Sequence, residues 1–462
     1  MMLRNRSLLV ILALSVLLRV GVALYLGDAT PPAKDETSYA LLAARVATGH
    51  GFTFAAAWYP FTPAGAPTAH WSFLYTAFVA AVYVVFGPHP LAVRLVQAVI
   101  AGAFMPWLAW RLFWRTFPAQ ALQPWTLPRL GWTIHHFPPL LAALLTASYA
   151  YFVLYAAMIQ TEAFFLLAIL WSLERSMTLQ QTLLACDARA GGNGGRSQRA
   201  PWLFAACTLG IGLGMAALLR QSILPWVAVL CAWLIVSAWL ADRSPLASAR
   251  SIQALRGARL SSAVLAVTSV LLLLLAAILP FTLRNYRVYG EFLLLNSNAG
   301  YAMYSAQHPL HGVTFNAYVA APLPTDFASL PVNEAQWDRA LMMRGIQFIL
   351  ADPGRYLLLS ASRAVDYFEF WPKESSSLLF NVGRVASFTL LLPFMLFGVW
   401  IALKRDHCGA WRLLLLFVVF YSLLHIFTWA MPRYRLPVDA VLLLFAAAAL
   451  ADLATHILPA HN

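Results

Sequence analysis

Residues 260–283 read Leu-Ser-Ser-Ala-Val-Leu-Ala-Val-Thr-Ser-Val-Leu-Leu-Leu-Leu-Leu-Ala-Ala-Ile-Leu-Pro-Phe-Thr-Leu, and none of them is charged. An apolar run of about 20 residues is long enough to cross the hydrocarbon core of a bilayer as a helix. The ten runs predicted to do so are 8–26, 91–113, 138–158, 162–179, 202–219, 223–241, 260–283, 385–403, 411–429 and 436–455. This pattern predicts an all-α, polytopic membrane protein.

The composition of the 462-residue chain agrees with this prediction, since 61% of its residues are hydrophobic and only 11% are charged. Soluble domains contain roughly 45–50% apolar and about 25% charged residues. A soluble globular enzyme and a disordered chain are therefore excluded. A membrane β-barrel is excluded because the apolar runs are continuous, whereas barrel strands alternate. The four cysteines have no metal-site spacing, and no disulfide is expected.

The net charge of +13 is attributed to loops that face the cytoplasm, where Arg and Lys accumulate. Basic residues cluster at the N-terminus and in segments 114–137, 174–200, 242–259 and 404–412. All of these segments fall on one side only if the shorter apolar run 71–86 does not cross the membrane. We therefore expect 71–86 to be an interfacial or re-entrant helix, with both termini inside. The alternative, an ordinary short span and a different orientation, stays open.

This topology divides the chain into three parts. Residues 1–283 form a predicted N-terminal transmembrane module, with a long first outer loop at 27–90. Residues 284–384 form a second outer segment with short helices, and 385–462 hold the C-terminal transmembrane helices. The first span lacks a clear cleavage site and is expected to stay as a signal anchor.

Three acidic residues lie where the predicted spans leave the membrane. Asp35 and Glu36 follow the first span, with Tyr39 one helical turn further on. Such a pair can supply a buried general base, or it can simply cap a helix, and the residues alone favour neither. Glu162 lies at a very short outer turn, where an acid is costly and usually has a function. Its alternative role is to stabilise the N-terminus of the fourth span.

Arginines on the outer side form a second set. Arg220 ends the fifth span, Arg284 and Arg287 follow the seventh, and Arg433 and Arg435 precede the tenth. They break the rule that positive charge accumulates inside. Arginines at the outer surface suit a lipid-linked phosphate, which a guanidinium binds through two parallel hydrogen bonds. The alternative for any one of them is that its side chain reaches out to lipid headgroups.

Histidines are scattered through the two outer segments. His50 and His70 lie in the first, and His308 and His311 lie in the second. No spacing among them is a specific metal signature, so each is expected to be structural. A Gly-rich phosphate loop is missing, which argues against a nucleotide-driven pump.

Several short segments occur in an order that matches a known family. They are Asp35-Glu36-Thr37-Ser38-Tyr39, Thr68-Ala69-His70-Trp71-Ser72-Phe73-Leu74-Tyr75, Thr161-Glu162-Ala163-Phe164, Leu283-Arg284-Asn285-Tyr286 and Arg433-Tyr434-Arg435-Leu436-Pro437. In this order the chain resembles the GT-C membrane glycosyltransferases, in the bacterial group related to protein O-mannosyltransferases and lipid A aminoarabinose transferases. The resemblance covers most of the chain and is specific for the superfamily rather than for a substrate.

The resemblance implies an enzyme that takes a sugar from a polyprenyl phosphate or diphosphate on the outer face of a bacterial inner membrane. The family's catalytic carboxylate matches Asp35, and Glu162 is implied at the same cavity. Membrane-parallel helices are implied in the first outer loop. The residues expected to bind substrate are Glu36, Tyr39, His70, Tyr75, Arg220, Arg284, Tyr286, Arg433, Tyr434 and Arg435.

One segment departs from the family pattern. Relatives often have an acid and two prolines in the interfacial segment, where this chain has His70, Ser72 and Phe73. In some relatives that acid helps to bind a metal. A divalent metal therefore cannot be carried over to this chain, and the acceptor class is in doubt.

The sequence thus predicts an inverting glycosyltransferase that moves a sugar from a polyprenyl-linked donor to a hydroxyl of a protein, lipid or glycan. Nucleic acid is not an expected partner. Two other classes stay open. One is a multi-pass transporter or a flippase for lipid-linked sugars, and the other is an enzyme like an O-antigen polymerase or ligase. Convergence of Asp35, Glu162 and Arg433 on one outer cavity would favour the glycosyltransferase.

Overall fold

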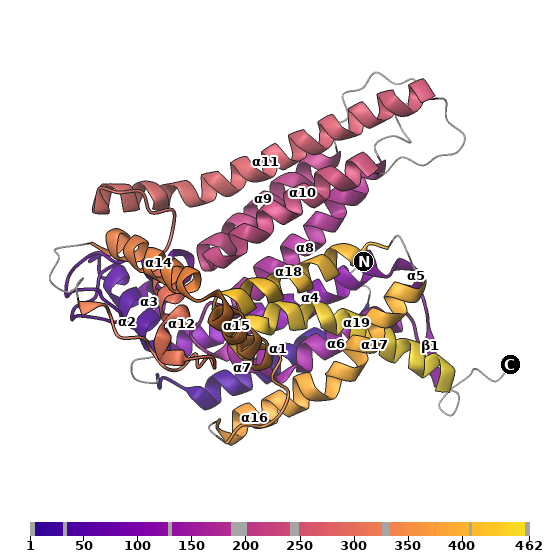
Figure 1. The fold of residues 1–462 in the computed structure, drawn as a ribbon. Helices are drawn as coiled ribbons and strands as arrows, with labels where there is room; N and C mark the ends of the chain where they lie inside the picture. The colour runs from indigo at the N-terminus through magenta and orange to yellow at the C-terminus, as the bar shows by residue number, and fades with distance from the viewer. Residues whose placement is uncertain are drawn as a thin grey trace.

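The computed structural model is a bundle of long helices, with shorter helices gathered at one end (Figure 1). The structure describes residues 5–30, 35–127, 132–185, 201–240, 249–325, 333–374, 376–405 and 409–457. The predicted all-α architecture is confirmed. The described residues add one antiparallel hairpin, β1 (Trp125–Leu127) and β2 (Trp132–Ile134). Cys207 and Cys231 are free thiols, and the other two cysteines lie outside the described residues.

All ten predicted apolar runs are helical. They form α1 (Arg6–Leu26), α4 (Pro90–Thr116), α6 (Phe137–Ser148) with α7 (Ala150–Ala157), α8 (Glu162–Ala185), α9 (Pro201–Leu219), α10 (Leu224–Leu240), α11 (Ala249–Tyr289), η5 (Val385–Thr389) with α17 (Leu390–Arg405), α18 (Trp411–Phe427) and α19 (Leu436–Ile457). Within the described residues, seven helices are long and apolar enough to span a membrane, or eight if α6 and α7, bent by 51°, form one span. The other two predicted spans are α8, which carries Glu174 and Arg175, and α18, which has 17 residues.

The helix α3 (Phe73–Phe86) begins and ends at one end of the bundle. The first turn of α4 contacts the residues that follow α1, since the Leu91 amide donates to Asp28 Oδ1 at 2.8 Å. The segment between Asp28 and Leu91 therefore begins and ends at the same end of the bundle. The other helix in this stretch, α2 (Asp35–Ala47), has only 13 residues and is too short to cross. This agrees with the charge pattern, which predicted that 71–86 does not span.

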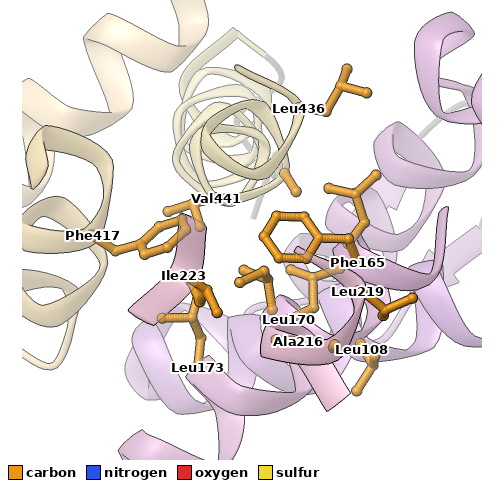
Figure 2. Close-up of a cluster of buried hydrophobic side chains, with 14 of the residues drawn as sticks. Leu108, Phe165, Leu170, Leu173, Ala216, Leu219, Ile223, Phe417, Leu436 and Val441 are labelled. Carbon is orange, nitrogen blue, oxygen red and sulfur yellow. The ribbon is translucent and has the colours of Figure 1, made fainter. Parts of the chain in front are cut away.

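The core forms where α4, α8, α9, α18 and α19 meet. Figure 2 shows its side chains, which include Leu108, Phe165, Leu170, Leu173, Ala216, Leu219, Ile223, Phe417, Leu436 and Val441. The segment Pro432–Thr455, which contains α19, is the central helix, because 83% of its apolar window is buried, compared with 28% for α1. The short turn η6 (Pro432–Arg435) leads into this helix and is therefore anchored by the core.

Two helix pairs approach closely at glycines. A Cβ atom at Gly398 of α17 would lie 2.0 Å from the Phe445 carbonyl oxygen of α19. A Cβ at Gly102 of α4 would lie 2.7 Å from the Val16 Cα of α1. Any larger residue at these positions would force the helices apart, which is the usual reason for small residues between membrane helices.

Four further helices lie at the α2–α3 end of the bundle (Figure 1). They are α12 (Ala299–Gln307), α14 (Glu334–Ala351), α15 (Pro353–Tyr367) and α16 (Leu378–Arg384). The buried Glu334 joins α14 to the loop before α3. Its carboxylate accepts hydrogen bonds from Thr62 Oγ1 (2.7 Å), the Ala69 amide (2.8 Å) and Ser297 Oγ (2.9 Å). This network fixes the loop that carries His70.

Candidate active site

A cavity of about 580 Å³ lies at the α2–α3 end. Its wall combines the first turn of α2, the loop before α3, the turn before α8, η3 (Gln221–Ile223), the segment that enters α12, the end of α18, and η6. The acidic and arginine side chains among its lining residues are Asp35, Glu162, Arg220 and Arg433, which we call the charged quartet. These residues are distant in the sequence, and only the fold brings them together.

Asp35 lies in the first turn of α2 and accepts a hydrogen bond from Arg433 Nη1 at Oδ2, over 2.6 Å. The same nitrogen also donates to Gln160 Oε1 at 3.3 Å. Burial disfavours the charged form of Asp35, but Arg433 outweighs it, with help from Arg220. The pKa of Asp35 therefore lies below its ordinary value, and the carboxyl group is ionised at neutral pH.

Glu162 begins α8 and forms a buried ion pair with Arg220. Arg433 Nε lies 3.6 Å from Glu162 Oε1, so this arginine faces both acids. Arg220 is held in place as well, because its Nε donates to Thr161 Oγ1 at 2.8 Å. The quartet is thus one row of alternating charges, Asp35–Arg433–Glu162–Arg220, which is neutral as a whole.

Five buried polar atoms of the cavity wall have no hydrogen-bond partner among the described residues. They are Glu162 Oε2, Arg433 Nε, His70 Nδ1, Trp71 Nε1 and His425 Nε2. Buried polar atoms are normally paired, and an unpaired one marks a position that a ligand or water can satisfy. The quartet therefore has one hydrogen-bond donor, Arg433 Nε, and one acceptor, Glu162 Oε2, that a ligand could use.

A divalent metal does not fit these side chains. Asp35 and Glu162 are each paired with an arginine, so a cation placed between them would meet two positive charges. Burial lowers the pKa of His70, against the opposing effect of Glu334, and keeps the imidazole neutral. Within the described residues, no three His, Cys, Asp or Glu side chains are grouped to hold an ion.

Aromatic side chains form the rest of the wall. Tyr39 and Trp71 both line the cavity, with ring centroids 5.4 Å apart. Burial, reinforced by the nearby Asp35, raises the pKa of Tyr39, so its hydroxyl stays protonated. Tyr434 lies against the guanidinium of Arg220, at 5.0 Å from the ring centroid. The predicted site residues Tyr39, His70 and Tyr434 are therefore all placed at the cavity.

Glu36 and Tyr75, both predicted to bind substrate, lie outside the cavity lining. Glu36 faces away from Asp35, pairs with the buried Arg94 at 2.8 Å, and accepts from the Ile159 amide at 2.9 Å. Tyr75 donates to Gln97 Oε1 at 2.8 Å. These contacts join α2 and α3 to α4, and Tyr75 also lines the second, apolar cavity described below.

Three further candidates also lie outside the lining. Arg435 is fully buried and pairs with Asp439 at 2.8 Å inside the bundle. Arg284 lies beside the Phe73 ring, with the guanidinium 5.6 Å from the centroid. Tyr286 is 58% exposed on the side of α11. Their distance from the cavity lining does not support the binding roles expected for them.

The sequence interpretation missed several uncharged residues of the wall. They are Gln221, Asn296, Asn298, Tyr301 and His425. Gln221 Nε2 donates to Asn298 Oδ1 at 2.8 Å, which fixes this amide at the cavity. Asn298 is the N-cap of α12, yet its side chain makes no capping bond. An Asn before a helix normally signals a cap, so the sequence carried no sign of this placement.

A second cavity, of about 690 Å³, lies between α3, α4, α8 and α9. Its lining is almost wholly apolar and includes Phe78, Phe104, Phe164 and Ile211. Phe104 and Ile211 are 49% and 52% exposed, so this cavity opens on the side of the bundle. Leu219 lines both cavities, which makes them neighbours.

The arrangement of helices is that of the GT-C membrane glycosyltransferases, as the sequence resemblance implied. The evidence for this fold comes from solved structures. No protein-family model matches the chain, and no curated protein matches it significantly.

Two solved structures illustrate the similarity. The oligosaccharyltransferase AglB from Archaeoglobus fulgidus, in complex with an inhibitory peptide and a dolichol-phosphate, matches 99% of this chain with a TM-score of 0.56 and 14% identity. ArnT from Cupriavidus metallidurans, bound to undecaprenyl phosphate, matches 96% of the chain with a TM-score of 0.50 and 12% identity. The matches cover 53% of AglB and 59% of ArnT, so the chain spans little more than half of either structure.

Proposed function

We propose that this protein is an inverting glycosyltransferase that uses a sugar bound to a polyprenyl phosphate carrier. The observation that carries the proposal is the convergence of Asp35, Glu162, Arg220 and Arg433 on one cavity in a chain with the GT-C fold. A transporter gives no reason for an ionised acid beside spare arginine donors at one end of the bundle. The two neighbours described above hold dolichol-phosphate and undecaprenyl phosphate, which supports a carrier of this class.

The donor would lie across both cavities. Arg433 and Arg220 would hold the phosphate, since a guanidinium binds phosphate oxygens through parallel hydrogen bonds. The polyprenyl tail would lie in the apolar cavity, which opens on the side of the bundle and meets the first cavity at Leu219. The sugar would then face Asp35 and the aromatic wall. We place this end of the bundle on the outer face of a bacterial inner membrane, because the basic loops lie at the other end.

The chemistry is a single displacement. The acceptor hydroxyl oxygen attacks the anomeric carbon while Asp35 takes its proton. The bond from the anomeric carbon to the phosphate oxygen breaks, and polyprenyl phosphate leaves with both electrons. Arg433 and Arg220 stabilise the charge that develops on it. One displacement inverts the anomeric centre, as in single-step glycosidases. Glu162 orients Arg220 and Arg433 for this task.

The test is transfer from a panel of radiolabelled polyprenyl-phosphate sugars, with purified protein in lipid and a membrane extract as acceptor. We expect Asp35→Asn to lower transfer by about 10²–10⁴-fold. The matched control is Asp28→Asn, because Asp28 lies at the same end of the bundle and Asn can still accept from the Leu91 amide. A folded Asp35→Asn protein with most of its activity would refute the assignment. The fraction that acquires label names the acceptor class.

A further inference from the structure

Arg433 has two tasks that conflict, and the conflict suggests an order of events. In the structure it neutralises Asp35, and in the proposed reaction it must neutralise the donor phosphate. We propose that Arg433 changes partner when the donor binds, so that the donor phosphate itself releases Asp35 to act as the base. This inference rests on the proposed function and adds to it a control of the catalytic acid by the substrate.

The resting arrangement is a poor one for proton abstraction. Asp35 receives a charged hydrogen bond of 2.6 Å from Arg433 Nη1, which stabilises the carboxylate. A carboxylate with a low proton affinity is a weak base, because efficiency rises as the pKa approaches the working pH. Asp35 is therefore held ionised but unreactive until this contact is broken.

Arg433 can be drawn away more easily than Arg220. All of its hydrogen bonds, to Asp35 and to Gln160 Oε1 at 3.3 Å, use a single nitrogen, and its Nε lies 3.6 Å from Glu162 Oε1 with no hydrogen-bond partner among the described residues. Arg220, in contrast, donates through two nitrogens, to Glu162 and to Thr161 Oγ1 at 2.8 Å, while the Tyr434 ring faces both arginines. A phosphate oxygen pair offers Arg433 two parallel hydrogen bonds, which are stronger than the one that it leaves. Arg220 would stay in place and guide the phosphate in.

The charged and titratable groups that face Asp35 determine whether its pKa rises or falls when Arg433 leaves. From η6 it meets Arg433, and from the end of α9 it meets Arg220. His70 faces it from the loop before α3, where burial keeps the imidazole neutral. Tyr39 and Tyr59 face it as well, and burial raises the pKa of each, so both stay uncharged. The fourth quartet member, Glu162, is negative and only disfavours a second negative charge.

Donor binding would therefore raise the proton affinity of Asp35 in two ways. It removes the positive charge of Arg433, and it adds a negative phosphate nearby. The loss of an opposite charge at this range changes a carboxyl pKa by about 1–3 units. An acceptor that enters first meets an inactive base, which predicts that the donor binds before the acceptor is activated.

The decisive measurement is the titration of Asp35 with and without polyprenyl phosphate that carries no sugar. This ligand supplies the phosphate and permits no turnover. Infrared difference spectra report the protonated carboxyl, and the band is assigned by its loss in Asp35→Asn. We expect the titration midpoint of Asp35 to rise by about 1–3 pH units with the lipid. An unchanged or lower midpoint would overturn the exchange.

Two variants separate the exchange from a general effect of lipid. In Arg433→Gln the midpoint should already be high without lipid, and polyprenyl phosphate should raise it much less than in the wild type. In Arg433→Lys the wild-type rise should be reduced, because an ammonium cannot make two parallel hydrogen bonds. If neither variant folds, the wild-type titration alone decides. If the wild type transfers sugar but the titration midpoint of its Asp35 does not move, the exchange is refuted and the proposed function is kept. If no donor supports transfer, the proposed function itself is refuted.

Discussion

The protein contains two clusters of acid and arginine side chains along α8, one at its start and one near its middle. The charged quartet surrounds Glu162 at the start of the helix, and the other cluster surrounds Glu174, roughly 18 Å further along. Glu174 is buried and pairs with Arg111 at 2.7 Å, with Arg115 at 3.5 Å and with Arg175. The two clusters are alike in the fold, since in each an acid lies against several arginines.

The two clusters differ in whether the carboxylate oxygens of the acid can accept a further hydrogen bond. Both oxygens of Glu174 accept hydrogen bonds from arginines, and Glu174 lines neither of the two cavities. Glu162 Oε2 and Arg433 Nε have no hydrogen-bond partner in the part of the chain that the structure describes, and their residues line a cavity. A saturated cluster stabilises a fold, whereas an unsaturated one beside a cavity can bind a ligand. Charge near the membrane surface is therefore not a sufficient sign of function.

The largest expected effect is on catalysis by a matched pair of arginine variants. Arg433→Gln should lower sugar transfer by about 10²–10³-fold, because a donor to the departing phosphate is lost. Arg111→Gln should leave the rate per folded molecule nearly unchanged. Transfer assays with folded protein, checked by size-exclusion chromatography, give both values. Equal losses in the two variants would remove the distinction between the clusters.

The second effect is on stability and should fall on the other cluster. Glu174→Ala leaves Arg175 and its neighbours without their acid inside the bundle, and removal of one partner of a buried pair costs about 3 kcal/mol. Thermal unfolding in detergent should show a clear decrease in Tm. Transfer per folded molecule should stay close to the wild-type rate. A stable Glu174→Ala protein would contradict the structural role.

The third effect is on the pH dependence of transfer at acid pH, which should differ between the free protein and its complex with the donor. The folded-state pKa of Asp35 lies below that of the unfolded chain, so its ion pair stabilises the fold above the unfolded value and is lost as the pH falls through the folded value. The acid limb of kcat/KM, which reports the free enzyme, should lie at correspondingly low pH. The acid limb of kcat should lie about 1–3 units higher, because Arg433 has left Asp35. Coincident limbs would count against the exchange of partners.

The smallest effect is expected at the uncharged wall. Asn298→Ala removes one amide that Gln221 holds at the cavity, and a neutral hydrogen bond contributes about 0.5–1.5 kcal/mol. We expect kcat/KM for the donor to fall by about 3–10-fold, with little change in Tm. The matched control is the exposed Asn316, which should tolerate Ala without loss. A loss as large as that of Arg433→Gln would give Asn298 a catalytic role.

The sequence was most informative where long apolar runs or isolated charges occur. The apolar runs predicted the spanning helices, and the distribution of arginine predicted that α3 does not cross. Asp35 and Glu162 stood out because the chain has only 18 acidic residues, and Arg220 and Arg433 stood out because they lie on the predicted outer side. Their functional roles stay predictions, while their convergence is a feature of the fold.

The sequence was least informative about the directions in which side chains point and about the roles of uncharged side chains. Asp35 and Glu36 are neighbours, but successive residues of a helix point about 100° apart, so one lines the cavity and the other faces Arg94. Arg433 and Arg435 diverge in the same way around η6. Gln221 and Asn298 gave no signal, because polar residues in loops are common. Only tertiary structure tells which of them meet a cavity.

The position of Arg433 also has a consequence for biosynthesis. This residue lies in η6, directly before α19, and the segment that contains α19 is the most deeply buried of the seven candidate spans described. Asp35 lies in α2, 398 residues before Arg433. A ribosome therefore makes the acid long before its arginine partner. On the proposed function, a growing chain would not transfer sugar until α19 is made and docks.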